Sequence, residues 1–230
     1  MKLFLLAAAA ALLVACPSAG AAPAHLRVLF VGNSLTAAND LPGMVAAIGA
    51  ARGVPIDVET YAPGGYALED HWADGRALDE LRTGHYDVVV MQQGPSSLPE
   101  SGANLTEWAK RWADEARADG TRPALLTVWP ERERTFAFPD VIRHYGAAAR
   151  EAGAGLFPAG LAWKLALPHG VRLYGPDHFH PSRLGTYLAA LVTYAGLTGE
   201  LPRTLPRAGG VAPKAALARV LRRAAAAALG

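Results

Sequence analysis

The chain has 230 residues, a formal net charge of +2 and a single cysteine. Hydrophobic residues make up 51% of it and charged residues 18%, which is a globular rather than a disordered composition. A net charge this close to zero gives no electrostatic footprint for nucleic acid and little steering of polyanionic substrates, so neither partner is expected.

The first 24 residues have the pattern of an export signal. One lysine precedes an apolar run at residues 3–14, which is too short to span a bilayer but suits a secretory signal. Residues 13–16 also resemble a bacterial lipobox, in which Cys16 would carry a lipid. We therefore expect residues 1–24 to be a signal peptide and residues 25–230 to be one domain, exported to the periplasm or secreted. Attachment to the membrane as a lipoprotein through Cys16 stays open.

Strand and helix patterns then alternate along the chain. Short apolar and β-branched runs predict strands at residues 25–31, 54–61, 87–92, 124–129 and 155–158. Helical patterns predict helices at residues 41–51, 66–81, 105–118, 140–152, 182–195 and 212–228. This alternation implies an α/β fold with a mostly parallel sheet covered by helices on both faces. In such folds the functional site lies beyond the carboxyl ends of the strands.

The carboxyl-terminal segment is basic. Residues 201–230 include six basic and no acidic residues, and the last predicted helix separates an apolar face from a face that carries Arg219, Arg222 and Arg223. We favour a helix docked on the domain with a solvated basic face; binding to a membrane or a polyanion is the alternative.

Ser34 directly follows the first predicted strand, in the run Gly32-Asn33-Ser34-Leu35. This position is a strand-to-helix turn, near the positive end of the next helix. On its own such a serine fits a turn or capping role. The run is not a Gly-x-Ser-x-Gly elbow, because residue 36 is threonine.

Asp177 and His180 lie three residues apart, directly before a predicted helix. A serine hydroxyl is a weak nucleophile, and it needs a base within hydrogen-bond reach and an acceptor that orients that base. His180 can serve as the base for Ser34, and Asp177 as the acceptor. The alternative is a metal site formed by Asp177, His178 and His180, since His-x-His can chelate a metal.

Two further segments offer donors for a developing oxyanion. Gly64 and Gly65 follow the second strand, where glycine lets a backbone N–H approach a reacting centre closely. Gln92 and Gln93 follow the third strand, where a side-chain amide could donate. Each segment taken alone also fits an ordinary turn. His71 lies between them in sequence, and we expect a hydrogen-bonded loop histidine there.

Taken together, these segments resemble the SGNH, or GDSL-like, hydrolases. Gly32-Asn33-Ser34-Leu35 is similar to the first block of that family, Gly65 falls at the oxyanion glycine of the second, and Asp177 to His180 fits the closing Asp-x-x-His block. The third block departs, because Gln92-Gln93-Gly94 stands where the family usually has Gly-x-Asn-Asp. Some carbohydrate O-acetylesterases of the family have Gln-Gly there, so Gln93 is the candidate replacement for the asparagine donor.

The resemblance implies a flavodoxin-like three-layer α/β/α sandwich with a mostly parallel five-stranded sheet. It also implies a catalytic triad of Ser34, Asp177 and His180, an oxyanion hole formed by Ser34, Gly65 and Gln93, and an acyl-enzyme mechanism with no metal or other cofactor. The expected substrate is a small ester or an acylated carbohydrate that loses a short acyl (acetyl) group.

Several alternatives stay open within this resemblance. They are a short-chain lipid or aryl esterase, a thioesterase, and a non-catalytic carbohydrate-binding relative. Tyr66, Trp72 and Trp129 are expected near strand ends, where their rings suit a sugar or an acyl chain, although core packing explains each equally well. The sequence does not indicate an oligomeric state.

Overall fold

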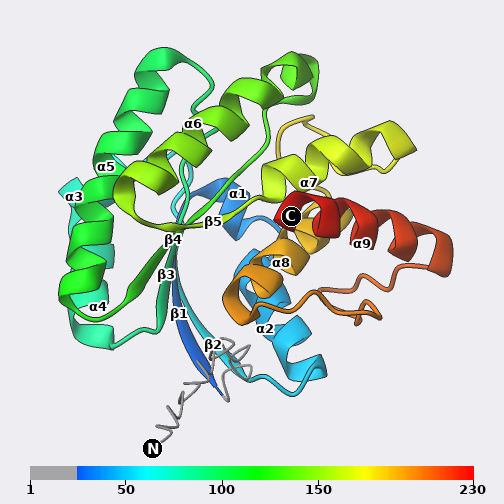
Figure 1. Ribbon diagram of the computed structural model, residues 1–230, viewed down its shortest axis with the longest axis horizontal. Coiled ribbons are helices and arrows are strands. Elements are labelled where there is room, and N and C mark those ends of the chain that lie inside the picture. The colour runs from blue at the N-terminus through cyan, green and yellow to red at the C-terminus, as the bar shows by residue number, and fades with distance from the viewer. Residues whose placement is uncertain (1–24) are drawn as a thin grey trace, which may run out of the picture.

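A computed structural model describes residues 25–230 of the protein. The predicted signal peptide, with the lipobox and Cys16, lies outside these residues. The described residues form one sheet of five strands in the order β2-β1-β3-β4-β5 (Figure 1). The strands are β1 (Leu26–Val31), β2 (Ile56–Tyr61), β3 (Val88–Met91), β4 (Arg122–Leu126) and β5 (Gly155–Phe157).

All four strand pairings of this sheet are parallel, so the expected mostly parallel sheet is entirely parallel in the described residues. The register pairs Val31 of β1 with Tyr61 of β2 and with Met91 of β3. The last residues of three strands therefore lie side by side. The loops that follow these strands meet at one edge of the sheet, which is the edge that carries the candidate site.

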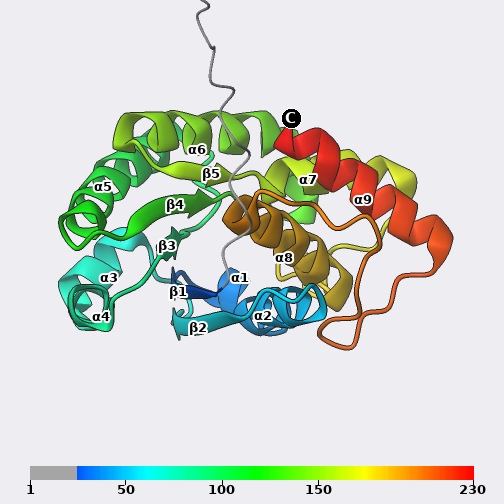
Figure 2. The same ribbon diagram turned by 60° about the horizontal axis from the view of Figure 1, so that its bottom comes forward.

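Helices cover both faces of the sheet (Figures 1 and 2). One layer consists of α3 (Leu68–Asp74), α4 (Arg76–Gly84), α5 (Pro99–Ala118) and α6 (Phe138–Ala152). The other layer consists of α2 (Leu41–Ala51), α7 (Ala159–Ala166), α8 (Arg183–Thr198) and α9 (Ala215–Leu229). Three short segments lie in connections: α1 (Ser34–Ala37) and the 3₁₀ helices η1 (Arg132–Ala137) and η2 (Leu167–His169). The strand order and the two helical layers confirm the expected flavodoxin-like sandwich.

The central strands are apolar because both of their faces are covered. Every residue of β3 is buried, as is β1 except for Arg27. A parallel sheet between two helical layers requires such continuous apolar strands. The resulting rigid centre holds the loops at its carboxyl edge.

Several predicted boundaries were wrong for local reasons. The predicted helix at 66–81 is two helices, because Gly75 has a φ of 82° and ends α3. α5 begins at Pro99, six residues early, since proline suits the first turn of a helix. α7 was not predicted, and α9 begins at Ala215 instead of residue 212. α2 and α8 begin within one residue of the predicted positions, where the side chains of Asp40 and Ser182 accept from Gly43 N and Gly185 N and so cap the two helices.

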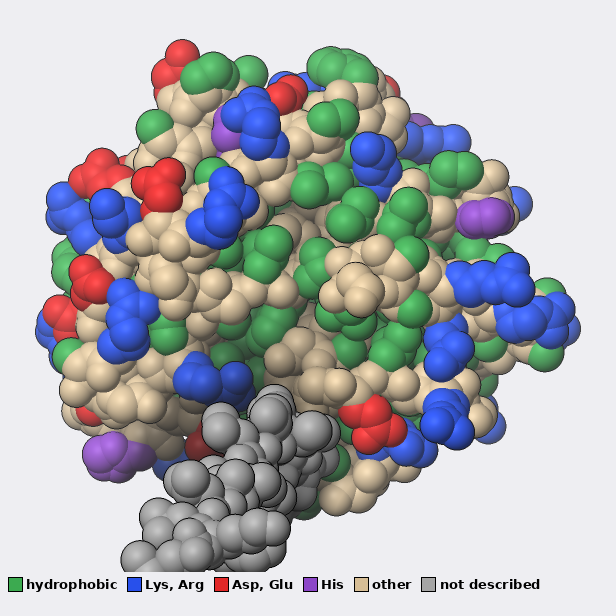
Figure 3. Space-filling model, viewed as in Figure 1, with side chains coloured by type: hydrophobic (Ala, Val, Ile, Leu, Met, Phe, Trp, Pro, Cys, Tyr) green, Lys and Arg blue, Asp and Glu red, His purple; other side chains and the backbone are tan. Residues whose placement is uncertain are grey.

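The last helix is docked on the domain. Leu221, Ala224 and Ala225 of α9 are buried in the core, whereas Arg219 and Arg223 are exposed. Figure 3 shows Lys and Arg side chains gathered on the side of the molecule where α9 lies. Of the helices within residues 25–230, none is both long and apolar enough to cross a bilayer.

Candidate functional site

The candidate site lies at the point where the strand order changes direction, since β2 lies on one side of β1 and β3 lies on the other. The connection after β1 runs through α2 on one face, and the connection after β3 runs through α5 on the other. Open α/β sheets bind ligands at such a switch point, beyond the carboxyl ends of the strands. Ser34 follows β1 here, and Gln92 and Gln93 follow β3.

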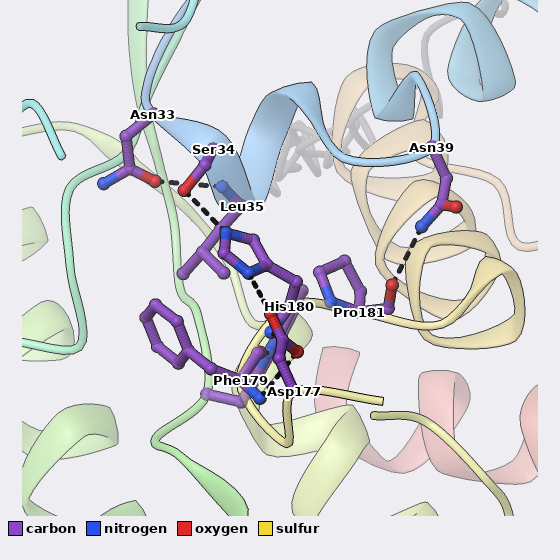
Figure 4. Close-up of polar contacts among 9 residues, drawn as sticks. Asn33, Ser34, Leu35, Asn39, Asp177, Phe179, His180 and Pro181 are labelled. Carbon is purple, nitrogen blue, oxygen red and sulfur yellow. Dashed lines mark hydrogen bonds and ion pairs between the residues drawn. The ribbon is translucent and has the colours of Figure 1, made fainter. Parts of the chain in front are cut away.

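Ser34, His180 and Asp177 form a continuous chain of hydrogen bonds (Figure 4). His180 Nε2 lies 2.9 Å from Ser34 Oγ, and His180 Nδ1 lies 2.5 Å from Asp177 Oδ2. Because a carboxylate only accepts hydrogen bonds, His180 Nδ1 carries the proton, and Nε2 is free to accept from the Ser34 hydroxyl. This arrangement can remove a proton from the serine as the oxygen attacks.

The second oxygen of Asp177 fixes its own loop. Asp177 Oδ1 accepts hydrogen bonds from the backbone N–H groups of Phe179, at 3.1 Å, and His180, at 3.0 Å. The His180 ring and these amides hold the pKa of Asp177 below its usual range, so the carboxylate stays ionised. Asp177 therefore aligns the imidazole and stabilises an imidazolium.

Backbone hydrogen bonds close the base of this loop. Gly175 N donates to His180 O at 2.7 Å, and Ser182 N donates to Leu173 O at 2.7 Å. The Ser182 side chain then caps α8 by accepting from Gly185 N. The loop is thus anchored to the start of a largely buried helix.

Asn39 ties the serine side of the site to the histidine side. Asn39 Nδ2 donates to Pro181 O at 2.9 Å (Figure 4). It also donates to Thr186 Oγ1 at 3.0 Å. Asn39 and the capping residue Asp40 both have left-handed φ values, of 55° and 58°. This turn carries the chain from α1 into α2 and keeps the Ser34 helix beside the His180 loop.

The segment after β4 supports the loop from the opposite side. Trp129 Nε1 donates to Phe179 O at 3.1 Å, and Arg132 N donates to His178 O at 2.9 Å. His178 Nδ1 lies 2.6 Å from Glu133 Oε1, and this partner lowers the pKa of Glu133. His178 thus contacts η1 instead of the Ser34 hydroxyl.

The alternative metal site finds no counterpart among the described residues. Within residues 25–230 no group of three or more His, Cys, Asp or Glu side chains is placed to hold a metal ion. Both ring nitrogens of His180 contact protein groups, and His178 is paired with Glu133.

The turn that presents Ser34 is held by Gln92. Gln92 is 1% exposed, and its Oε1 accepts from Asn33 N at 3.0 Å and from Thr36 Oγ1 at 2.8 Å. Gln92 Nε2 donates to Asn33 Oδ1 at 3.0 Å. A Cβ at Gly32 would lie 2.4 Å from Thr36 Oγ1 and 2.7 Å from Gln92 Oε1, so this packing requires glycine at position 32.

His71 of α3 also holds the turn that presents Ser34. It is buried within α3, and its Nε2 donates to Gly32 O at 2.7 Å. Its ring meets the Tyr66 ring edge-on at 5.1 Å, and Tyr66 O in turn accepts from Asn33 Nδ2 at 3.0 Å. Burial lowers the pKa of His71, which keeps the ring neutral. The expected hydrogen bond of His71 is therefore present. The expected loop position is wrong, because the loop ends at Ala67 and His71 lies in α3.

The candidate oxyanion residues line one hollow of about 390 Å³, which we call the serine hollow. Its wall includes Ser34, Gly65, Tyr66, Gln93, Asn104 and Phe179. Gly65 has a φ of 80°, a left-handed conformation that glycine adopts without strain. Within residues 25–230 the backbone N–H groups of Ser34 and Gly65 donate to no other protein group. Both therefore remain available to a ligand oxygen.

Gln93 lines the serine hollow, but its amide already has protein partners. Gln93 Oε1 accepts from Leu68 N at 3.2 Å. Gln93 Nε2 donates to Ser96 Oγ at 3.0 Å and, over a long 3.4 Å, to Asn104 Oδ1. A ligand oxygen would have to replace the second of these contacts.

Of the three aromatic residues singled out in the sequence, Tyr66 lines the serine hollow. Trp129 is 1% exposed and stacks on Trp163 with ring centroids 3.6 Å apart. Trp72 lies in α3 and packs against two other tryptophan rings. Core packing therefore explains Trp129 and Trp72.

No protein-family model matches the chain, and neither does any curated protein. Solved structures do. A candidate SGNH hydrolase from Slackia heliotrinireducens superposes with a TM-score of 0.65 at 26% identity, covering 75% of this chain and 99% of that one. A DUF4886 family protein from Bacteroides uniformis gives a TM-score of 0.75 at 18% identity, covering 89% and 95%.

The similar structures also include a tryptophan variant of an acetyl xylan esterase from Geobacillus stearothermophilus. It has a TM-score of 0.61 at 17% identity and covers 77% of this chain and 97% of that one. Structures similar to this chain thus include SGNH hydrolases and esterases. At this distance the likeness is one of fold.

Sequence reasoning missed Asn39 and Asn104, and it named Gln92 and His71 without predicting the partners through which they hold the Ser34 turn. Gln92, Asn39, His71 and Asn104 act through buried or long-range hydrogen bonds, and no local pattern marks such partners. The one available signal was the pair of adjacent glutamines after a buried strand, since polar residues there must find partners at the carboxyl edge of the sheet.

Proposed function

We propose that the protein is a serine esterase that works through an acyl-enzyme intermediate. The observation that carries this proposal is the hydrogen-bond chain from Ser34 Oγ through His180 to Asp177. A nucleophile, a base and an orienting carboxylate in this order are the minimum that activates a serine hydroxyl.

In the acylation step, Ser34 Oγ attacks the ester carbonyl carbon while His180 Nε2 takes the hydroxyl proton. The bond from the carbonyl carbon to the alcohol oxygen then breaks, and the departing oxygen receives that proton from His180. In the second step, water attacks the acyl carbon and gives its proton to His180. The bond to Ser34 Oγ breaks, the acid leaves and Ser34 regains its proton.

The negative charge of each tetrahedral intermediate needs donors on the side opposite the histidine. We assign this role to the backbone N–H groups of Ser34 and Gly65, together with the Gln93 side chain. The unused N–H groups and the shared hollow support the first two. Gln93 would exchange its long contact with Asn104 for the oxyanion.

The substrate we favour is a carbohydrate that carries short acyl groups, in particular acetyl groups. The serine hollow is small, and its wall combines polar residues such as Gln93 and Asn104 with the apolar Phe179. Acetyl xylan esterases share the fold. A short-chain lipid or aryl esterase, a thioesterase and a non-catalytic carbohydrate-binding protein are the alternatives that substrate assays distinguish.

Acetate release tests the proposal. The protein is incubated with p-nitrophenyl acetate and with acetylated xylan, with and without a chelator, beside its Ser34→Ala variant. We expect turnover of both acetates that resists the chelator and is lost in the variant. A folded protein without turnover would favour a binding role, and chelator-sensitive turnover that survives Ser34→Ala would favour a metal site.

We also propose that the protein is exported, on the pattern of residues 1–24. Expression of the whole chain in a bacterial host with labelled palmitate tests both forms of export. Label on the protein that is lost in Cys16→Ala indicates a lipoprotein. An unlabelled, shortened chain outside the cytoplasm indicates a cleaved signal peptide, and a full-length chain in the cytoplasm contradicts export.

A further inference from the structure

A second hollow of about 200 Å³, which we call the side hollow, adjoins the serine hollow. The two hollows share Pro95, Ser96, Ser101 and Phe179. A ligand atom near Ser34 can therefore be joined to a larger group that extends past Phe179.

The position of Phe179 indicates which part of an ester would extend this way. Phe179 precedes His180, and the centroids of their rings lie 5.3 Å apart (Figure 4). In the proposed mechanism His180 returns its proton to the alcohol oxygen, so the alcohol must leave beside the His180 ring. The side hollow therefore lies on the side of the departing alcohol, and the acyl group would occupy the serine hollow.

Two separate connections form the far wall of the side hollow. Ser97 and Leu98 follow β3, while Pro130, Glu131 and Arg134 follow β4. Arg134 Nη2 donates to Ser97 Oγ at 3.4 Å, which joins the two connections across the hollow. In the described part of the chain, Arg134 and Glu131 are the only charged residues that line either hollow.

The chemistry of the side hollow combines apolar surfaces with hydrogen-bonding groups. Phe179, Pro130 and Leu98 offer apolar surface, and Leu98 is 56% exposed. Ser97, Glu131 and Arg134 offer donors and acceptors at its rim. A sugar ring has the same two kinds of surface, C–H faces and hydroxyl edges, whereas an aliphatic alcohol would offer no hydrogen-bond partner to the groups at the rim.

We propose that the side hollow is the leaving-group subsite, that it binds the sugar ring of an acylated carbohydrate, and that Arg134 is a specificity-determining residue that donates hydrogen bonds to the sugar hydroxyls. This inference rests on the proposed esterase function. It adds a subsite that only a large, hydroxyl-rich alcohol group would use.

The test compares a large and a small ester. Acetylated xylo-oligosaccharides carry the sugar, and ethyl acetate has an alcohol too small to reach Arg134. The readout is the ratio of kcat/KM for the first ester to kcat/KM for the second. Arg134→Ala should lower this ratio by roughly tenfold, the usual cost of losing one hydrogen bond to a charged group.

Arg132→Ala is the matched control. Arg132 is an exposed arginine of the same 3₁₀ helix, but its side chain lines a separate surface hollow beside Leu173 and Tyr174. We expect the ratio to be unchanged in this variant.

The possible failures are distinct. Hydrolysis of both esters with a ratio that Arg134→Ala does not change would overturn the subsite and leave the esterase proposal intact. An equal drop of the ratio in Arg134→Ala and Arg132→Ala would also overturn the subsite. So would an Arg134→Ala variant whose kcat/KM falls by the same factor on both esters. No hydrolysis of either ester by the unchanged protein would overturn both proposals.

Discussion

Gln92 and Asn33 form a reciprocal pair beneath the Ser34 turn. Gln92 Oε1 accepts from Asn33 N at 3.0 Å, and Gln92 Nε2 donates to Asn33 Oδ1 at 3.0 Å. Asn33 Oδ1 also accepts from Leu35 N and so caps the short helix that begins at Ser34. The end of β3 thereby fixes the backbone that presents the candidate nucleophile.

Replacing Gln92 with leucine should damage both stability and turnover. The variant leaves Asn33 N and Thr36 Oγ1 without their partner in a buried site, and it removes one of the two donors to Asn33 Oδ1. Each unmet group costs about 1–3 kcal/mol. We expect the free energy of unfolding in urea to fall by at least that amount, and kcat to fall because the Ser34 turn loosens. A variant with unchanged stability and kcat would show that the pair does not hold the turn.

Gln93→Ala should behave differently from its neighbour. If Gln93 donates to the oxyanion, its loss lowers kcat by roughly 10²–10³ and changes KM little, since the contact strengthens only in the transition state. Steady-state kinetics on p-nitrophenyl acetate measure both constants. An unchanged kcat would rule out Gln93 as a donor and leave the Ser34 and Gly65 amides.

Asp177→Asn should keep the loop and lose the chemistry. The asparagine oxygen can still accept from the Phe179 and His180 amides, while its NH₂ group faces His180 Nδ1. That contact favours the tautomer with a proton on Nε2, which cannot accept from Ser34. We expect kcat to fall by up to about 10⁴ with an unchanged circular dichroism spectrum.

Asp140→Asn is the control for this change. The Asp140 side chain is about half exposed, and it pairs with Arg143 at 2.7 Å on the outer face of α6. We expect its kcat to match that of the unchanged protein. A similar kcat in both variants would contradict the orienting role of Asp177.

The sequence predicted the fold because its signals are local. Val88-Val89-Val90 indicates a strand buried on both faces, and Asp40 with Pro42 indicates a helix start. It also placed Ser34, Asp177 and His180 after strands or before a helix, where the topology brings them together. The failures arose where tertiary contacts decide. Trp129 follows a strand, where an aromatic side chain can line a site. It is buried instead, because it stacks on Trp163 of α7, a helix that was not predicted.

The buried histidine predicts a pH dependence of stability. Burial lowers the pKa of His71 below its usual value near 6.5, which it regains in the unfolded chain. Between these two pKa values the unfolded state binds the extra proton, so stability decreases as the pH falls below about 6.5 and is fully present above it. The slope contributed by this one group is at most about 1.4 kcal/mol per pH unit.

His71→Gln isolates this contribution, because glutamine can still donate to Gly32 O but does not titrate. The free energy of unfolding in urea, measured from pH 5 to pH 8, should decline less steeply toward low pH in the variant. Equal slopes in the two proteins would show that His71 is not held neutral by the fold.

The most direct test of the central claim is the mass of the protein after treatment with a serine-directed fluorophosphonate, with p-nitrophenyl acetate hydrolysis followed in the same samples. If Ser34 is the nucleophile, the protein forms a single adduct on the peptide that contains Ser34 and loses hydrolysis in step with labelling, and Ser34→Ala shows neither adduct nor hydrolysis. A folded protein that forms no adduct, or one that hydrolyses the ester equally well as Ser34→Ala, would contradict the claim.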